Sequence, residues 1–220
     1  MKSLSRYTAL LVFLISFSAC SAREADNKPT ATAQLSSEVK ARLDTAYFAS
    51  GCFWCTEAVF ERVKGVEDVI SGYSGGSSKN PNYRQVSAGL TDHAEAVRVA
   101  YDPEVVSYKD LVYIFFGSHD PTQLNRQGPD VGKQYRSAIF YTSSEEKSIA
   151  TDVMQELNKK KYNGGIVTEI TQFSAFYAAE DYHQDYYEIH PSQPYIVSVS
   201  KPKVEKFMKE FKDKLKDEYK

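Results

Sequence analysis

Apolar and polar positions recur along the chain either with the alternation of a strand or with the roughly 3.6-residue period of an amphipathic helix. The segments with strand character are residues 45–49, 66–73, 95–101, 137–141 and 166–173. The segments with helical character are residues 54–63, 108–116, 144–160, 178–189 and 203–219. Because strands and helices interleave, the pattern predicts a mixed sheet with helices packed on it, of the α+β or α/β class.

Two cysteines occupy the junction between the first predicted strand and the first predicted helix. Cys52 follows Gly51 directly, and Cys55 lies three residues further on, one helical turn away. A helix N-terminus stabilises an anion, which favours a reactive thiolate at Cys52. A second thiol within reach can resolve an oxidised Cys52 by forming a disulfide with it.

Two other interpretations of this cysteine pair are open. A structural disulfide suits an exported protein, although so short a loop would constrain the unfolded chain little. A zinc site would need two further ligands, and the four histidines form no finger-like spacing. The residues alone therefore favour a redox-active pair and leave the structural disulfide as the main alternative.

A carboxyl group interrupts the apolar face of the third predicted strand. Glu95 shares that face with Val97, Val99 and Tyr101. Burial on such a face disfavours the charged form of a carboxyl, raises its pKa and keeps it protonated. Glu95 is thus a candidate proton donor, and a carboxylate that faces water at a strand end is the alternative.

The first 20 residues have the pattern of a secretory signal. Lys2 and Arg6 precede an apolar run, residues 10–17, which is too short to span a bilayer. The sequence Phe-Ser-Ala-Cys at residues 17–20 resembles a lipoprotein cleavage site, in which Cys20 becomes the lipidated first residue. We therefore expect an exported protein, either periplasmic or anchored to the membrane by lipid at Cys20 and facing the periplasm or the cell exterior.

Composition shifts divide the rest of the chain. Residues 21–44 are polar without an apolar period and are predicted to be a linker, residues 45–200 form the expected catalytic domain, and residues 201–220 form a C-terminal amphipathic helix. The apolar stripe of that helix comprises Val204, Phe207, Met208, Phe211 and Leu215. We expect this stripe to pack on the domain, a membrane-surface helix being the alternative.

Charge and size narrow the functional classes further. The chain has 220 residues, 42% of them hydrophobic, which suits one soluble domain with a tail. A net charge of −2 is not the basic excess that nucleic-acid binding favours, so no nucleic-acid partner is expected.

A short motif, Gly51-Cys52-Phe53-Trp54, surrounds the candidate nucleophile. It matches the active-site signature of the A-class peptide methionine sulfoxide reductases, which the sequence resembles. Five further blocks follow in register: residues 72–76 with 80–83, 91–97 with 101–103, 119–122 with 125–130, 132–137, and 179–184. Six blocks in order across residues 45–195 make the resemblance specific. It implies an α+β fold, a two-layer sandwich with a ferredoxin-like core.

The resemblance also implies a role for each matching residue at the sulfoxide. Cys52 would be the nucleophile that attacks the sulfoxide sulfur. Glu95 would protonate the sulfoxide oxygen, and the hydroxyls of Tyr83 and Tyr135 would bind that oxygen. One thiolate, one acid and hydrogen-bond donors at the oxygen are sufficient for this reaction, so the chemistry agrees with these roles.

Three more residues match the family site, and two depart from it. Asp130 would be an acidic group near the site, and Phe53 and Trp54 would form aromatic walls around the S-methyl group of the substrate. Many family members have Gly in place of Cys55 and carry recycling cysteines near the C-terminus, whereas this chain has no cysteine after Cys55. Resolution therefore shifts onto Cys55. Asp92 replaces a common Gly and adds a charge near the acid.

The function that the resemblance implies is the reduction of methionine-S-sulfoxide, free or in oxidised proteins, to methionine. No bound cofactor is expected, and a thioredoxin-like protein would be the external reductant. A thioredoxin-like disulfide oxidoreductase is the alternative enzyme, because Cys-x-x-Cys at a strand–helix junction is typical of that class. A lipid-anchored binding module with a structural disulfide is the alternative outside enzymes.

Overall fold

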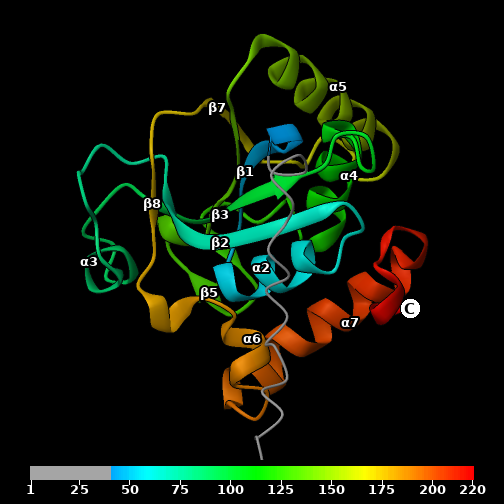
Figure 1. The fold of residues 1–220 in the computed structure, drawn as a ribbon. Coiled ribbons are helices and arrows are strands. Elements are labelled where there is room, and N and C mark those ends of the chain that lie inside the picture. Colours follow the sequence, from blue (N-terminus) through cyan, green and yellow to red (C-terminus); the bar gives the residue numbers. More distant parts are fainter. Residues whose placement is uncertain (1–40) are drawn as a thin grey trace, which may run out of the picture. The chain divides into compact units, whose positions relative to one another are not determined.

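A computed structural model describes residues 41–220 of the chain, drawn in colour in Figure 1. All of them belong to one unit, which spans Leu35–Lys220. The predicted signal, with Cys20, and nearly all of the predicted linker lie outside the described residues.

A six-stranded mixed sheet forms the centre of this unit (Figure 1). In spatial order its strands are β7 (Glu169–Gln172), β6 (Ser137–Tyr141), β1 (Asp44–Ser50), β3 (Ala94–Tyr101), β2 (Val66–Ser74) and β8 (Phe176–Ala178). Neighbouring strands are antiparallel, except that β6 and β7 are parallel. A separate two-stranded ribbon joins β4 (Arg126–Gln127) to β5 (Asp130–Val131). β1 and β3 are neighbours at the centre of this sheet, and one end of each strand reaches the site described below.

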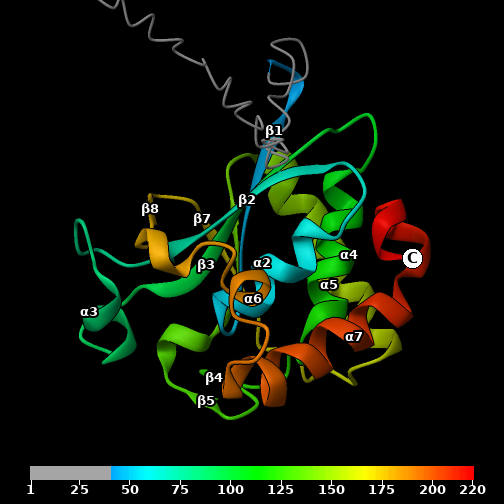
Figure 2. The ribbon, with the colours of Figure 1, turned by 60° about the horizontal axis from the view of Figure 1, so that its bottom comes forward.

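Helices cover one face of the sheet. They are α2 (Phe53–Glu61), α4 (Tyr108–Ser118), α5 (Ser144–Lys160) and α7 (Lys201–Glu210), and Figure 2 shows α2, α4 and α7 together on that side. The main core lies between these helices and the sheet. A smaller cluster, built on Ala94, Ala96 and Phe140, lies on the opposite face under Phe173 and Phe176. The predicted α+β class with helices on a mixed sheet is confirmed, whereas the ferredoxin-like detail stays a prediction.

Local sequence signals account for most element boundaries. The Ser107 and Ser143 hydroxyls each accept a hydrogen bond from a backbone N–H in the first turn of α4 and α5, at 3.1 Å in both cases. A five-residue helix, α3 (Tyr83–Ser87), was not predicted. It begins with a capping box between Asn82 and Gln85, which is too short a signal to stand out from the surrounding loop.

The predicted helix over residues 178–189 is wrong. Residues 176–178 form the edge strand β8, residues 181–183 form a 3₁₀ turn, and only α6 (Tyr186–Ile189) is helical. Backbone pairing of β8 with β2 outweighs the helical spacing of the apolar residues here. Asp185 then takes a left-handed conformation, with φ of 53°, which interrupts any continuous helix.

The C-terminal helix is shorter than predicted. α7 ends at Glu210 and is followed by two 3₁₀ turns, because the chain turns back so that Leu215 pairs with Val63 and becomes buried. Val204 and Phe207 are buried against the domain, so the expected packing of the stripe is present. Among residues 41–220, no helix combines the length and the apolar character needed to cross a membrane.

Candidate active site

Cys52 lies at the junction between β1 and α2. Gly51 makes the turn between them with φ of +94°, and a Cβ there would lie 2.6 Å from Cβ of Gln127, so both conformation and space require glycine. Cys52 is the N-cap residue of α2 and is buried. The position at a helix N-terminus that the sequence predicts is therefore present.

Glu95 approaches the same point from the neighbouring strand β3. Its Oε2 accepts a hydrogen bond from the backbone N–H of Phe53 at 3.1 Å, and the side chain is buried. Burial raises the pKa of Glu95 to about 8. The hydrogen bond from Phe53 acts in the opposite direction, and the negative charge of Asp130 raises the pKa further. Glu95 thus holds a proton at neutral pH beside the residue that follows Cys52.

These groups open onto a cavity of about 290 Å³. Its lining consists of Cys52, Phe53, Trp54, Tyr83, Glu95, Asp130, Tyr135, Gln193 and Tyr195. Every site residue predicted from the sequence is in this lining except Cys55. Gln193 and Tyr195 were missed, because they follow the matching blocks and no periodicity or spacing distinguishes them from the other polar and tyrosine residues of that segment.

Trp54, which lines the cavity, is packed against aromatic residues of the segment 178–189, where the sequence had predicted a helix. The Trp54 indole stacks on Tyr186 with ring centroids 3.9 Å apart, and its Nε1–H donates a hydrogen bond to Nδ1 of His183 at 3.2 Å. His183 is buried against Tyr83 and Phe53 as well. His183 belongs to a matching block, but the resemblance assigned it no role.

Neutral hydroxyls line the rest of the cavity. Burial raises the pKa of Tyr83 to about 12 and also raises the pKa of Tyr135, so both remain hydrogen-bond donors at any physiological pH. The Tyr195 hydroxyl donates to Oδ2 of Asp130 at 2.5 Å. The cavity therefore offers donors and one protonated carboxyl to an oxygen atom, next to a thiol and between aromatic walls.

Cys55 lies behind the cavity, one turn along α2. Its thiol donates a hydrogen bond to Oγ of Ser200 at 3.2 Å, and both cysteines are free thiols and buried in this structure. Burial raises the pKa of Cys52, whereas a hydrogen bond from Cys52 lowers the pKa of Cys55 to about 7. The expected depression of the Cys52 pKa by the helix N-terminus is thus outweighed by burial. The first negative charge of the pair therefore resides on Cys55.

Asp92 lies outside this arrangement. It is exposed and lines a separate polar hollow of about 250 Å³ with Lys133, Arg136 and Glu169. The neighbouring charges that raise the pKa of Glu95 are those of Asp130 and Cys55. Within residues 41–220, no group of three or more His, Cys, Asp or Glu side chains is placed to hold a metal ion.

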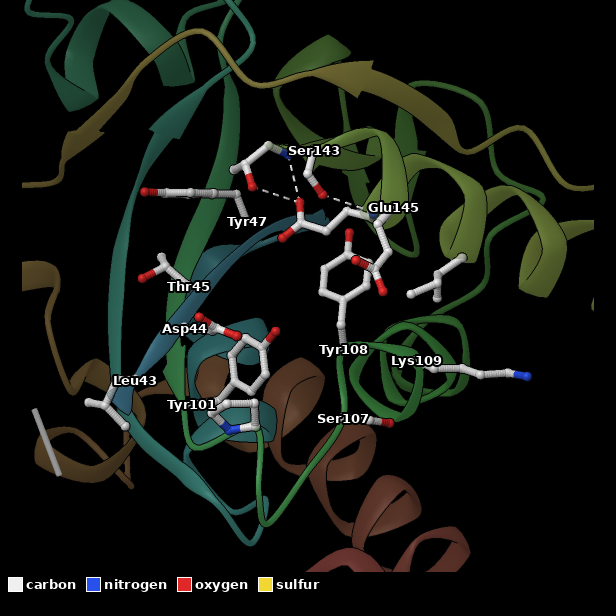
Figure 3. Close-up of a pocket in the computed structure, with 14 residues that line it drawn as sticks. Leu43, Asp44, Thr45, Tyr47, Tyr101, Ser107, Tyr108, Lys109, Ser143 and Glu145 are labelled. Carbon is white, nitrogen blue, oxygen red and sulfur yellow. Dashed lines mark hydrogen bonds between the residues drawn. The ribbon is translucent and has the colours of Figure 1, made fainter. Parts of the chain in front are cut away.

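A larger cavity, of about 670 Å³, lies at the other end of β1 (Figure 3). Asp44, Tyr47, Tyr101 and Tyr108 are among its lining residues, and the Lys109 side chain points away from them. It contains no cysteine and none of the predicted site residues. The candidate active site is therefore assigned to the smaller cavity, where a nucleophile and an acid meet.

Comparison with known proteins shows the family to which the chain belongs. The sequence profile of the family described as peptide methionine sulfoxide reductase matches residues 44–215. The chain belongs to this family. A relative from Sulfolobus acidocaldarius, the peptide methionine sulfoxide reductase MsrA, is 53% identical over 172 residues, which are 78% of this chain and 97% of that protein. Family membership also decides against the thioredoxin-like alternative.

Solved structures of similar proteins share the fold. The methionine sulfoxide reductase A of Corynebacterium diphtheriae has a TM-score of 0.66 and 36% identity, covering 69% of this chain and 77% of that one. Mxr1 from Saccharomyces cerevisiae in its reduced form has a TM-score of 0.65 and 35% identity, covering 70% of this chain and 88% of that one. The sheet and helices around the site are therefore those of the family.

Proposed function

We propose that this member of the family reduces methionine-S-sulfoxide, free or in oxidised proteins, to methionine, with Cys52 as the nucleophile. One observation carries the assignment: the Cys52 thiol and the protonated Glu95 carboxyl open onto the same cavity, joined through the Phe53 backbone N–H. The test is to incubate the reduced protein with peptides that contain the S or the R sulfoxide. With the S form only, each protein molecule should form one methionine and lose two thiols.

The first step is an oxygen transfer from substrate sulfur to enzyme sulfur. The Cys52 thiolate forms when its proton passes to Cys55, and its sulfur then attacks the sulfoxide sulfur. Glu95 gives its proton to the sulfoxide oxygen, while the hydroxyls of Tyr83 and Tyr135 donate hydrogen bonds to that oxygen. The protonated oxygen then moves from the substrate sulfur to the Cys52 sulfur while the sulfur–sulfur bond formed by the attack breaks, so methionine leaves and Cys52 becomes a sulfenic acid. Phe53 and Trp54 exclude water and hold the S-methyl group.

The second step returns the enzyme towards its reduced state. Cys55 gives up the proton that it took from Cys52, its sulfur attacks the Cys52 sulfur, and the S–OH bond breaks. The departing hydroxide takes up that proton and leaves as water. The resulting disulfide needs an external dithiol, for which we propose a thioredoxin-like protein because such proteins reduce disulfides by exchange. The backbone supports this step, since Cys55 follows Cys52 within the first turn of α2.

Replacing Cys55 by Ser separates the two steps. The variant should still form about one equivalent of methionine per protein, because Cys52 and the cavity lining are intact. It should not turn over with thioredoxin, because no disulfide can form, yet should turn over with dithiothreitol, which can reach the sulfenic acid directly. Methionine formed per active site is measured with each reductant. Full thioredoxin-dependent turnover by this variant would exclude the resolving role.

We also propose that the protein is exported and anchored by lipid at Cys20. The charged start, the short apolar run and the Phe-Ser-Ala-Cys sequence support this location. Cys20→Ala should release the protein from the membrane fraction of a bacterial host and remove the mass of the lipid, whereas the control Thr30→Ala should change neither. Fractionation and mass spectrometry make the measurement. A Cys20→Ala protein with unchanged membrane attachment and mass shift would exclude lipidation there.

A further inference from the structure

Two buried polar groups of the C-terminal region belong to the segment that packs against α2. Ser200, the residue before α7, is completely buried, and its Oγ lies 3.2 Å from the Cys55 sulfur. Lys203 follows three residues later, on the same face of α7, which packs against α2. Its Nζ is buried, and within the part of the chain that the structure describes it has no hydrogen-bond partner. Neither residue lines the substrate cavity.

A buried ammonium is costly unless a negative charge lies nearby. Two other lysines of α7 face solvent and approach glutamates one turn on, Lys201 with Glu205 and Lys206 with Glu210, whereas Lys203 forms no ion pair among residues 41–220. Its positive charge acts on two buried groups, Cys55 and His119. Burial lowers the pKa of His119 to about 4, so His119 is neutral. Cys55 is therefore the acid that the ammonium can hold in its ionised form.

We infer that Lys203 is the counter-ion of the Cys55 thiolate and that, together with the Ser200 hydroxyl, it activates Cys55 for disulfide formation. This inference rests on the proposed function and adds two residues to it. Ser200 touches the reacting sulfur, whereas Lys203 acts on it through its charge. During resolution the Cys55 thiolate supplies the electron pair of the new S–S bond, and the hydroxyl of the sulfenic acid leaves with a proton as water.

The positive charge of Lys203 also decides which sulfur of the Cys52–Cys55 disulfide an external thiolate attacks. When an external thiolate reduces the disulfide, the sulfur that departs as an anion is the one whose charge Lys203 favours, which is Cys55. The incoming thiolate then forms its mixed disulfide with Cys52, the sulfur that lines the cavity. Lys203 therefore favours Cys55 as the ionised partner both when the disulfide forms and when it is reduced.

The test compares Lys203→Met with the matched control Lys206→Met, which removes an exposed ammonium from the same helix. Reduced proteins are mixed with excess sulfoxide peptide, and methionine and remaining thiols are followed by rapid quench. Lys203→Met should keep a burst of one methionine per protein, because the residues that line the substrate cavity are unchanged. Its disulfide formation at pH 7 should slow several-fold, because the Cys55 thiolate loses the positive charge that favours it. Lys206→Met should match the wild type in both steps.

The pH profile distinguishes a charge effect from a packing effect. In Lys203→Met the disulfide rate should recover as the pH is raised, because Cys55 then ionises without the help of the Lys203 charge. The other titratable groups around Cys55 are Cys52, Glu95, Asp130, Tyr187 and Tyr195, and all of them are unchanged in the variant. Lys203→Arg, which keeps the charge, should retain the wild-type profile.

Ser200→Ala provides a second route should Lys203→Met fail to fold, as judged by circular dichroism. It should slow disulfide formation several-fold and leave the size of the methionine burst at one per protein. An unchanged disulfide rate in both variants, or in Ser200→Ala alone if the other does not fold, overturns the inference. So does a methionine burst slowed as much as disulfide formation. Absence of a burst in the wild type would instead overturn the proposed function, so the two failures are distinguishable.

Discussion

The variant Cys52→Ser is expected to form methionine no faster than the uncatalysed reaction. A serine hydroxyl is a far weaker nucleophile than a thiolate towards sulfur, and Cys52 supplies the one thiol in the lining of the site cavity. Cys55 cannot take over, because it lies behind that lining beside Ser200. The measurement is methionine released from a sulfoxide peptide in a single turnover and in the presence of dithiothreitol.

Cys55→Ser is the matched control for this loss, since it removes the neighbouring thiol of the same helical turn. It should retain its stoichiometric burst of methionine, so that a general effect of losing a buried thiol is separated from loss of the nucleophile. More than trace reductase activity in Cys52→Ser would contradict the mechanism.

Glu95→Gln is expected to slow methionine formation in a single turnover by about 10²-fold or more. The amide keeps the shape of the side chain but cannot give a proton to the departing oxygen. The wild-type rate should also fall as the pH rises through about 8, because the acid form of Glu95 exists below its raised pKa and is lost above it. The variant should lack this dependence. Single-turnover rates between pH 6 and pH 10 make the measurement.

Glu67→Gln is the matched control, because Glu67 is an exposed glutamate on the adjacent strand β2. Its rate and pH profile should equal those of the wild type. If Glu95→Gln kept the wild-type single-turnover rate, the proton would have to come from another group in the cavity, of which the Tyr83 and Tyr135 hydroxyls are the candidates.

Features decided by short-range chemistry could be predicted from the sequence. The position of Cys52 between a strand and a helix follows from a β-prone run, a glycine turn and a helical period, all within about 20 residues. The burial of Glu95 follows from strand alternation with Val97 and Val99. The family blocks then brought Tyr83, Tyr135 and Asp130 to the same site, although their spacing alone does not indicate it.

Features decided by contacts between distant segments could not be predicted from the sequence. The path of residues 176–189 depends on pairing of β8 with β2, about 100 residues earlier in the chain, and this pairing places His183 and Tyr186 against Trp54. The position of Tyr195 in the cavity also depends on a distant contact, because its hydroxyl binds Asp130, which lies 65 residues earlier in the sequence.

The ionisation of the cysteine pair is also a tertiary property. A helix N-terminus predicts a low pKa for Cys52, but burial beneath the aromatic walls raises it. The hydrogen bond from Cys52, the Ser200 hydroxyl and the Lys203 ammonium instead favour the anion at Cys55. The spacing Cys-x-x-Cys thus determined that two thiols can meet. Which of them carries the charge depends on desolvation and on a helix that lies 145 residues away in the sequence.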